Sequence, residues 1–479
     1  DSPYHHATRL RSDPGDIAVL SELGLDPSAR NNEGDTALHL AARLRAEAQG
    51  LALLAAGSDP LLANAAGATP LTTALTASGG PLVWFFTPEV LAAEDPSGNG
   101  PLHHAAMAGL ADGAAYLARL GVPVDGKNDD GQTALMLALK RDSTGTVNAL
   151  LALGADPGIR DSSGSTALHL AVYWRATECL KLLARSASSL DPRDYTGKTP
   201  LRDAVDRSDA QATAFLLERG ADPLARDNSG ETPLHAAARI ADDRFTSALA
   251  AKAGRVDVRD DSGATPLLEA VYAENARSAR ALASLGASIH SRDSAGESPL
   301  SYALKKGGAV LQALLDQKTA RSSDADGRSV IRVILEAKPS IDFIELALAA
   351  GASVDDRDAF GRSPLHVAAT NGYAEIAELL VAAGADRFVR DSGGATPAVI
   401  ALSRGDAMIA ALFGASPNDA DYLGETALHY AAAGGLDRAA QALLALGADT
   451  ARRNAAGETP ADVAARRGHA ALAKLLAGE

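Results

Sequence analysis

Histidines recur along this chain, and histidine is the side chain that most often binds metal or moves protons near neutral pH. Six of them follow a leucine: His39, His103, His169, His235, His366 and His429. Two adjacent pairs also occur, His5-His6 and His103-His104. Neighbours on a helix point about 100° apart, so an adjacent pair is a poor chelator of an ion that needs ligands at about 2 Å.

Two short motifs resemble ligand loops without completing them. Gly197-Lys198-Thr199 resembles the end of a phosphate-binding loop, but Pro192 stands where that loop needs its first glycine. The run 324–327 (Asp-Ala-Asp-Gly) resembles part of a calcium loop, but Ser322 and Val333 occupy its first and last ligand positions. The sequence therefore predicts no catalytic residue, no metal site and no cofactor.

A phrase of the form Gly-x-Thr-Pro-Leu sets the frame in which these residues lie. Its glycine occurs fourteen times between Gly34 and Gly457, and nine of the thirteen intervals equal the one from Gly131 to Gly164. Separate globular domains do not keep such a register, so we predict one all-α solenoid without linkers. The phrase is not recognisable in residues 1–15. We expect a degenerate N-terminal capping repeat at 1–33, thirteen repeats at 34–456 and a C-terminal capping repeat at 457–479.

Each repeat carries its own start and stop signals. A threonine such as Thr199 can cap a first helix, and Pro200 suits the first helical position. A second helix ends at a glycine such as Gly154, and 161–164 (Asp-Ser-Ser-Gly) has the signature of a β-turn. The predicted repeat is turn, helix, turn, helix. Arg-Asp pairs recur at these turns and form a ladder of alternating charge along the fingers, and we expect them to act mostly in turn chemistry and in pairing between repeats.

The repeated phrase is similar to that of the ankyrin-repeat family over essentially the whole chain. The resemblance rests on the runs 36–39 (Thr-Ala-Leu-His), 232–237 (Thr-Pro-Leu-His-Ala-Ala) and 363–366 (Ser-Pro-Leu-His), and on Gly-Ala-Asp ends at Gly220, Gly384 and Gly447. It implies stacked L-shaped units with β-turn fingers that form a curved superhelical rod. It also implies a concave face that binds other proteins, and no catalysis.

In this frame the leucine-linked histidines lie two layers apart, which is about 16–20 Å. They cannot share a metal ion, and we expect each to hydrogen-bond neighbouring turns. All six fall in odd-numbered repeats when the repeat that begins at Gly34 is the first. This alternation suggests that the array grew by pairs of repeats rather than by single ones.

Composition excludes several classes of function. The chain has 479 residues, 46% of them hydrophobic but only 4% aromatic, and a net charge of −15. Such an acidic protein repels nucleic acid and anionic lipid. No apolar run reaches the roughly 18 residues of a membrane span, and the single Cys179 excludes an intrachain disulfide. We expect a soluble monomer, in the cytoplasm, in the periplasm or secreted after processing. The alanine- and arginine-rich composition suggests a bacterial source.

Two positions near the end of each first helix should face the concave side. Over fourteen repeats they hold ten basic residues and two acidic ones, although cations also suit a helix C-terminus. The predicted protein-binding residues are Arg43, Lys140, Arg141, Tyr173, Trp174, Arg207, Arg239, Tyr272, Lys305 and Lys306. Aromatic fingertip residues that could add contacts are Tyr195, Phe360 and Tyr422.

These residues favour a non-catalytic scaffold that binds a protein partner, with an acidic segment, in its concave groove at repeats 4–9. Exposed aromatic and arginine side chains are the usual anchors of protein interfaces. One alternative is a structural spacer or self-assembling rod without a specific ligand. Another is the binding of an anionic polymer to the basic strip, which would depend steeply on salt.

Overall fold

The computed structural model describes residues 1–337 and 339–479, and within them thirty α-helices form fifteen consecutive pairs. The first helices of the pairs are α1 (Pro3–Leu10), α3 (Ala37–Leu44), α5 (Pro70–Leu75), α7 (Pro101–Met107), α9 (Ala134–Ala138), α11 (Ala167–Tyr173), α13 (Pro200–Asp206), α15 (Pro233–Arg239), α17 (Pro266–Tyr272), α19 (Pro299–Lys306), α21 (Val330–Ala337), α23 (Pro364–Asn371), α25 (Pro397–Arg404), α27 (Ala427–Gly434) and α29 (Pro460–Arg467).

The second helices complete the pairs. They are α2 (Pro14–Glu22), α4 (Glu47–Ala55), α6 (Pro88–Leu91), α8 (Ala111–Arg119), α10 (Thr144–Ala152), α12 (Thr177–Ser186), α14 (Ala210–Glu218), α16 (Asp243–Ala253), α18 (Ala276–Ser284), α20 (Gly308–Leu314), α22 (Ile341–Ala349), α24 (Ala374–Ala382), α26 (Asp406–Phe413), α28 (Asp437–Ala445) and α30 (Ala470–Ala477). Three short 3₁₀ turns are η1 (Val83–Phe85), η2 (Leu139–Arg141) and η3 (Thr319–Arg321).

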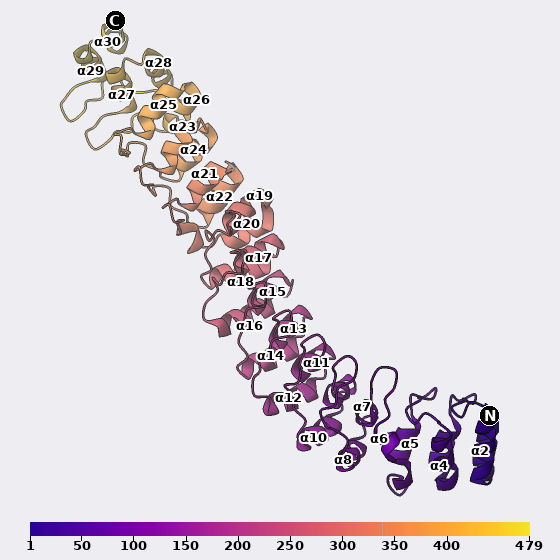
Figure 1. Ribbon diagram of the computed structural model, residues 1–479. Helices are drawn as coiled ribbons and strands as arrows, with labels where there is room; N and C mark the ends of the chain where they lie inside the picture. Colours follow the sequence, from indigo (N-terminus) through magenta and orange to yellow (C-terminus); the bar gives the residue numbers. More distant parts are fainter. Residues whose placement is uncertain (338) are drawn as a thin grey trace. The chain divides into compact units, whose positions relative to one another are not determined.

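The chain divides into two compact units, each with its own stack of helix pairs (Figure 1). The first unit holds residues 1–237 and 251–253, and the second holds 238–250 and 254–479. In the first unit α7 packs on α9 and α8 on α10. In the second unit α23 packs on α25 and α24 on α26. Like helices therefore contact like helices of the next repeat, as the sequence period predicts.

The predicted start signal works as a helix cap. In repeat 6 the Thr199 hydroxyl accepts the backbone N–H of Arg202 at 3.3 Å, and Pro200 is the first residue of α13. Just before them Gly197 has a φ of +82°, a backbone conformation that a side chain disfavours. The Thr-Pro pair and the preceding glycine thus fix where the first helix begins.

The β-turn fingers are held by a repeated set of hydrogen bonds. Asp194 Oδ1 accepts the backbone N–H groups of Thr196 and Lys198 at 2.8 and 2.9 Å. The backbone N–H of Tyr195 donates to the carbonyl of Ser163 in the previous finger at 3.1 Å. Among the described residues the fingers contain isolated β-bridges, such as Lys127 with Thr133, and no named strand.

The Arg-Asp pairs combine turn contacts with contacts between successive fingers, as expected, but the contacts between fingers run from arginine to a backbone carbonyl rather than from charge to charge. Arg160 donates from Nη1 to the carbonyl of Gly164 at 2.9 Å and to the carbonyl of Arg193 one repeat on. Arg292 donates in the same way to the carbonyl of Gly296 at 2.8 Å. The aspartates of these pairs accept backbone N–H groups of their own turns, so the arginines bind the carbonyl oxygens that remain.

Small and aliphatic side chains fill the space between the helices. Ala171, Val172 and Leu183 of repeat 5 are buried, as are their counterparts in other repeats. Repeat 2 is an exception, because its second helix has only four residues. There the buried ring of Phe86 packs edge-on against Tyr116 with 5.1 Å between ring centres, which replaces part of the missing helical contact.

Candidate protein-interaction surface

The regularly spaced histidines link the repeats within the core and are largely buried. In repeat 5 the backbone N–H of Thr166 donates to His169 Nδ1 at 3.1 Å, so the ring proton sits on Nε2. That nitrogen lies 3.0 Å from the carbonyl of Lys198 in the next repeat. His39, His103, His366 and His429 make the same pair of contacts. Burial lowers the pKa of His169, which keeps the imidazole neutral.

A further histidine of this kind was missed in the first residues of the chain. The backbone N–H of Ser2 donates to His5 Nδ1 at 3.0 Å, and His5 Nε2 lies 2.9 Å from the carbonyl of Asp35. Ser2-Pro3-Tyr4-His5 is therefore a copy of the phrase, so the expectation that residues 1–15 lack it is wrong. Tyr4 in place of leucine hides it. His5 and His39 lie in adjacent repeats, so the odd-only alternation does not extend to this end of the chain.

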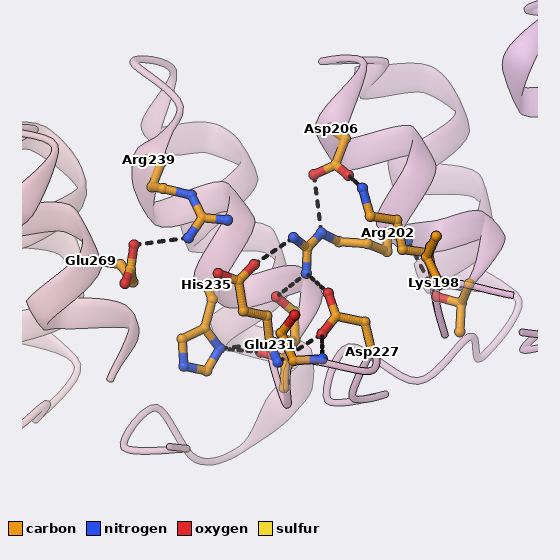
Figure 2. A network of polar contacts seen from close by, with 12 residues as sticks. Lys198, Arg202, Asp206, Asp227, Glu231, His235, Arg239 and Glu269 are labelled. Atoms are coloured by element: carbon orange, nitrogen blue, oxygen red, sulfur yellow. Dashed lines mark hydrogen bonds and ion pairs between the residues drawn. The ribbon is translucent and has the colours of Figure 1, made fainter. Parts of the chain in front are cut away.

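Two repeats carry a buried arginine at the position where seven others carry histidine. Figure 2 shows Arg202 between three carboxylates: Nε lies 3.0 Å from Asp206, Nη1 3.1 Å from Asp227 and Nη2 2.6 Å from Glu231. Asp227 and Glu231 belong to the next finger. The guanidinium therefore links two successive repeats as the histidine does, but through ion pairs instead of a hydrogen bond to a carbonyl. Arg332 makes the same kind of contact with Asp358.

The ligand-loop resemblances have structural roles. In the segment 197–199, which resembles the end of a phosphate-binding loop, Lys198 Nζ pairs with Asp206 at 2.7 Å. In the segment 324–327, which resembles part of a calcium loop, Asp324 accepts a hydrogen bond from the guanidinium of Arg328 at 2.8 Å. Burial and the nearby carboxylate of Asp142 raise the pKa of the Cys179 thiol, so the thiol stays protonated and unreactive. In the described part of the chain no group of three or more His, Cys, Asp or Glu side chains has an arrangement that could hold a metal ion.

Four of the predicted surface cations are neutralised by their own chain. Arg43 pairs with Asp35, and Lys305 pairs with Glu297, in both cases through the carboxylate of the finger before the same first helix. Arg239 pairs with Glu269 of the next repeat at 2.8 Å (Figure 2), and Lys306 pairs with Glu274 of the previous repeat at 2.7 Å. Residues separated by the same distance in sequence occupy the same two positions of the repeat. A repeat array can therefore form the same ion pair more than once, as Arg43 with Asp35 and Lys305 with Glu297 show.

Three other predicted cations have no such partner. Within the described residues, no carboxylate lies within ion-pair distance of Lys140, Arg141 or Arg207. Gln132 stands in the same sequence position relative to Lys140 as Glu297 does to Lys305, and Leu170 as Glu269 does to Arg239. Both residues are uncharged, so Lys140 has no ion-pair partner at either position. The place that Glu274 takes relative to Lys306 is taken by another cation, Arg175, relative to Arg207. These cations therefore keep their full charge toward solvent.

An exposed aromatic pair lies among these cations. Tyr173 and Trp174 are 48% and 43% exposed and meet edge-to-face, with 4.9 Å between ring centres. The guanidinium carbon of Arg207 lies 4.0 Å from the centre of the Tyr173 ring, and Lys140 Nζ lies 5.6 Å from the centre of the Trp174 ring. We name Lys140, Arg141, Tyr173, Trp174 and Arg207 the basic-aromatic surface. It lies within the first compact unit.

The ends of three successive first helices position this surface. Lys140 and Arg141 end η2, which follows α9; Tyr173 ends α11 and Trp174 follows it; and Arg207 follows α13. Next comes a left-handed residue in each repeat, for example Ser208 with a φ of +52°, which turns the chain toward the second helix. Cations at a helix C-terminus also interact favourably with its dipole. The repeat geometry thus presents the same helix end three times in succession.

The predicted anchor Tyr272 lies in the second unit and has partners of its own. Its hydroxyl donates to Asp293 Oδ2 at 2.7 Å, and its ring meets Tyr302 edge-to-face at 4.7 Å between centres. Burial and the Asp293 carboxylate raise the pKa of the Tyr272 hydroxyl. Because the neighbouring lysines are paired with glutamates, this cluster lacks the uncompensated charge of the basic-aromatic surface.

The predicted fingertip aromatics are all exposed. Tyr195, Phe360 and Tyr422 are 66%, 64% and 86% exposed. Tyr195 lies against Gly164 of the previous finger, where an added Cβ would come within 2.7 Å of the tyrosine ring. Its place is therefore set by the array, whereas the Phe360 ring is covered by the guanidinium of Arg362 at 5.1 Å.

Comparisons with known proteins agree with the repeated phrase. The family profile described as ankyrin repeats (3 copies) matches residues 81–161, 142–227, 209–293 and 399–479, which is more than half of the chain. The profile described as ankyrin repeats (many copies) matches residues 348–401. No helix in the described part of the chain combines the length and apolar character that crossing a bilayer demands.

Two individual proteins share part of this pattern. A curated protein of Danio rerio named "Putative palmitoyltransferase ZDHHC13" is 34% identical over 144 residues, which are 29% of this chain and 22% of that protein. The chain thus spans about a fifth of that relative's length. A crystal structure of the ankyrin repeat domain of Bcl-3 is 32% identical, with a TM-score of 0.41, over 43% of this chain and 93% of that one.

Proposed function

Because this chain belongs to the ankyrin-repeat family, we propose that it is a non-catalytic scaffold that binds a protein partner through the basic-aromatic surface. Ankyrin repeats generally mediate protein–protein interaction. The observation that supports this site is the contrast between neutralised and uncompensated cations. Arg43, Arg239, Lys305 and Lys306 have internal carboxylate partners, whereas Lys140, Arg141 and Arg207 surround two exposed aromatic rings without one.

The partner contributes an acidic segment. Carboxylates can bind Lys140, Arg141 and Arg207 without displacing an existing ion pair, so the desolvation cost falls only on groups that gain a partner. Tyr173 and Trp174 provide apolar area with few rotatable bonds, and such side chains dominate the energy of protein interfaces. A protein with a net charge of −15 repels a long polyanion outside this patch, which favours a short acidic peptide over nucleic acid.

Decaglutamate labelled with fluorescein tests this site by anisotropy. We expect the triple variant Lys140→Ala, Arg141→Ala, Arg207→Ala to weaken its binding at least tenfold. The matched control Arg43→Ala, Arg239→Ala, Lys305→Ala removes the same number of positive charges, but from ion-paired positions, and should change binding less than threefold. Equal loss in the two variants would show that net charge rather than this surface binds the peptide.

The same titration separates the alternative functions. Polyphosphate of matched charge should bind more weakly than the peptide, and tighter, steeply salt-dependent binding would favour an anionic-polymer ligand instead. We propose that the protein acts as a monomer. Light scattering at rising concentration should then give a constant mass, whereas a self-assembling rod would grow.

A further inference from the structure

A groove with different chemistry runs beside the basic-aromatic surface in repeats 2–4. Its volume is about 520 Å³, and its walls are the finger at 63–68, the threonine-rich face of α5 and the side chains of Met107 and Arg141. The finger carries Ala63 where later fingers carry arginines such as Arg160 and Arg193. Arg160 reaches the carbonyl of its own finger glycine, Gly164, whereas Ala63 leaves the corresponding place beside Gly67 without a long side chain.

The hydroxyl groups in the groove are acceptors. Thr73 donates its hydroxyl proton to the carbonyl of Thr69 at 2.9 Å, and Thr76 donates its own to the carbonyl of Thr72 at 2.8 Å. With their protons already used, these oxygens offer lone pairs to a ligand. The groove therefore suits hydrogen-bond donors, such as peptide N–H groups and the side chains of serine and asparagine. Met107 and the finger alanines add a small apolar area.

Arg141 joins the two sites, since it lines this groove and belongs to the basic-aromatic surface. It is also one of the cations without a carboxylate partner in the described residues. A ligand that places a carboxylate on Arg141 can extend into the groove in one direction and toward Tyr173 and Arg207 in the other. Tyr173 and the cation Arg207 thus lie on one side of Arg141, and the threonine hydroxyls that accept hydrogen bonds lie on the other.

We propose that the groove binds a second part of the same partner peptide, a stretch of small and hydrogen-bond-donating residues directly next to its acidic residues. This inference rests on the proposed function of the basic-aromatic surface and adds an order to the ligand. The acidic residues lie over repeats 4–6 and the small, donor-rich residues over repeats 2–4.

The repeat spacing sets the length of the peptide. Four layers separate repeat 2, with Thr76, from repeat 6, with Arg207. Stacked helices lie about 8–10 Å apart, so the span is about 32–40 Å. An extended chain advances about 3.3 Å per residue, so the bound segment has about 10–12 residues.

Selection from a library of random 16-residue peptides displayed on phage tests this order directly. Peptides selected on the wild-type protein should share an acidic run with serine, alanine or asparagine enriched on one side of it only. Synthetic copies of the best peptides then provide ligands for titration. An acidic run without any flanking preference would overturn the groove proposal and leave the proposed function standing.

A substitution that fills the groove tests whether the selected peptides bind there. Thr76→Tyr fits the repeat, because Tyr173 and Tyr272 occupy the same repeat position in other repeats. It should weaken binding of the selected peptides at least tenfold and leave binding of decaglutamate within threefold. Thr370→Tyr makes the same change in repeat 11 and should alter neither. Ala63→Arg is a second variant that restores the side chain of the other fingers, and it should abolish the flanking preference.

The outcomes distinguish the two proposals. Unchanged binding of the selected peptides by both Thr76→Tyr and Ala63→Arg would overturn the groove proposal alone. If the selection yields no peptide, or if the selected peptides bind equally well to the Tyr173→Ala, Trp174→Ala variant, the proposed function itself is wrong.

Discussion

The guanidinium carbon of Arg207 lies 4.0 Å from the centre of the Tyr173 ring, although the two residues belong to successive repeats. On the neighbouring ring, Lys140 approaches Trp174 from the repeat before. Three repeats therefore build one continuous surface of aromatic rings bordered by cations. Exposed contacts of this kind contribute only about 0.5–1 kcal/mol each to folding, so the surface can bind a ligand without being essential for stability.

Removing the two rings should weaken partner binding and leave the fold intact. We expect Tyr173→Ala with Trp174→Ala to cost about 2 kcal/mol or more of binding free energy, because exposed aromatic anchors dominate interfaces. Titration calorimetry with a selected acidic peptide measures it. Tyr422→Ala, which removes a more exposed fingertip ring in the second unit, should have no effect. Unchanged affinity in the double variant would refute the site.

The buried arginine of repeat 6 should matter for stability. Arg202→Ala leaves the carboxylates of Asp206, Asp227 and Glu231 without their shared partner, and breaking a buried ion network typically costs about 3–5 kcal/mol. Arg202→His introduces the side chain that seven repeats, His5 included, use at this position and should cost less. Urea denaturation followed by circular dichroism measures both. A cost for Arg202→Ala as small as that expected for the exposed Arg207→Ala would contradict this role.

Asp203 predicts an unusual dependence of stability on pH. Burial, followed by the nearby carboxylate of Asp194, raises its pKa to about 6. The folded state therefore holds this proton more tightly than the unfolded chain, whose aspartates titrate near pH 4. The stabilisation from the protonated form is complete below about pH 4 and is lost as the pH rises through 6.

Asp203→Asn should thus raise the melting temperature at pH 8, by an amount equivalent to roughly 1–3 kcal/mol, and have little effect at pH 4. Asp206→Asn offers a control of opposite sign, because Asp206 pairs with Lys198 and Arg202 and its loss should destabilise the protein at pH 8. An Asp203→Asn variant that is equally stabilised at both pH values would contradict the elevated pKa.

The buried histidines predict the opposite trend. Burial lowers the pKa of His39, His103, His169 and His366, so their contribution is present above the unfolded pKa of about 6.5 and is lost as the pH falls below it. His169→Leu should destabilise the protein by about 1–3 kcal/mol at pH 7, since the Lys198 carbonyl loses its donor. It should also flatten the decline of the melting temperature toward pH 5. The exposed His6→Leu should leave the stability at pH 7 unchanged.

The repeat and its boundaries could be predicted because each depends on a local preference. Thr199 and Pro200 fix the start of a first helix, and glycines such as Gly197 need a positive φ whatever surrounds them. The N-terminal capping repeat escaped this reasoning because Tyr4 replaces the usual leucine. Its histidine was the remaining signal, at the same distance from the helix start as in the other repeats that carry one.

The candidate surface could be predicted only in part. The chain period identified which positions face the same side, but it did not show which cations are neutralised. That depends on carboxylates elsewhere in the same repeat or in a neighbouring one, such as Glu297 for Lys305 and Glu274 for Lys306. These pairings follow from the repeat, so they could have been sought in the sequence. The groove beside α5 could not, because it depends on how Ala63 and Thr76 lie across the space between repeats.

The fluorescence of Trp174 tests the central claim most directly. The chain has two tryptophans, so Trp84→Phe leaves Trp174 as the single reporter, and Trp174→Phe leaves Trp84 as the control. On titration with decaglutamate or a selected acidic peptide, we expect the emission of Trp174 to shift or quench along a saturable curve. The emission of Trp84, which lies against Gly50 away from the basic-aromatic surface, should stay constant. Saturable peptide binding by anisotropy without any change in the emission of Trp174 would contradict the account.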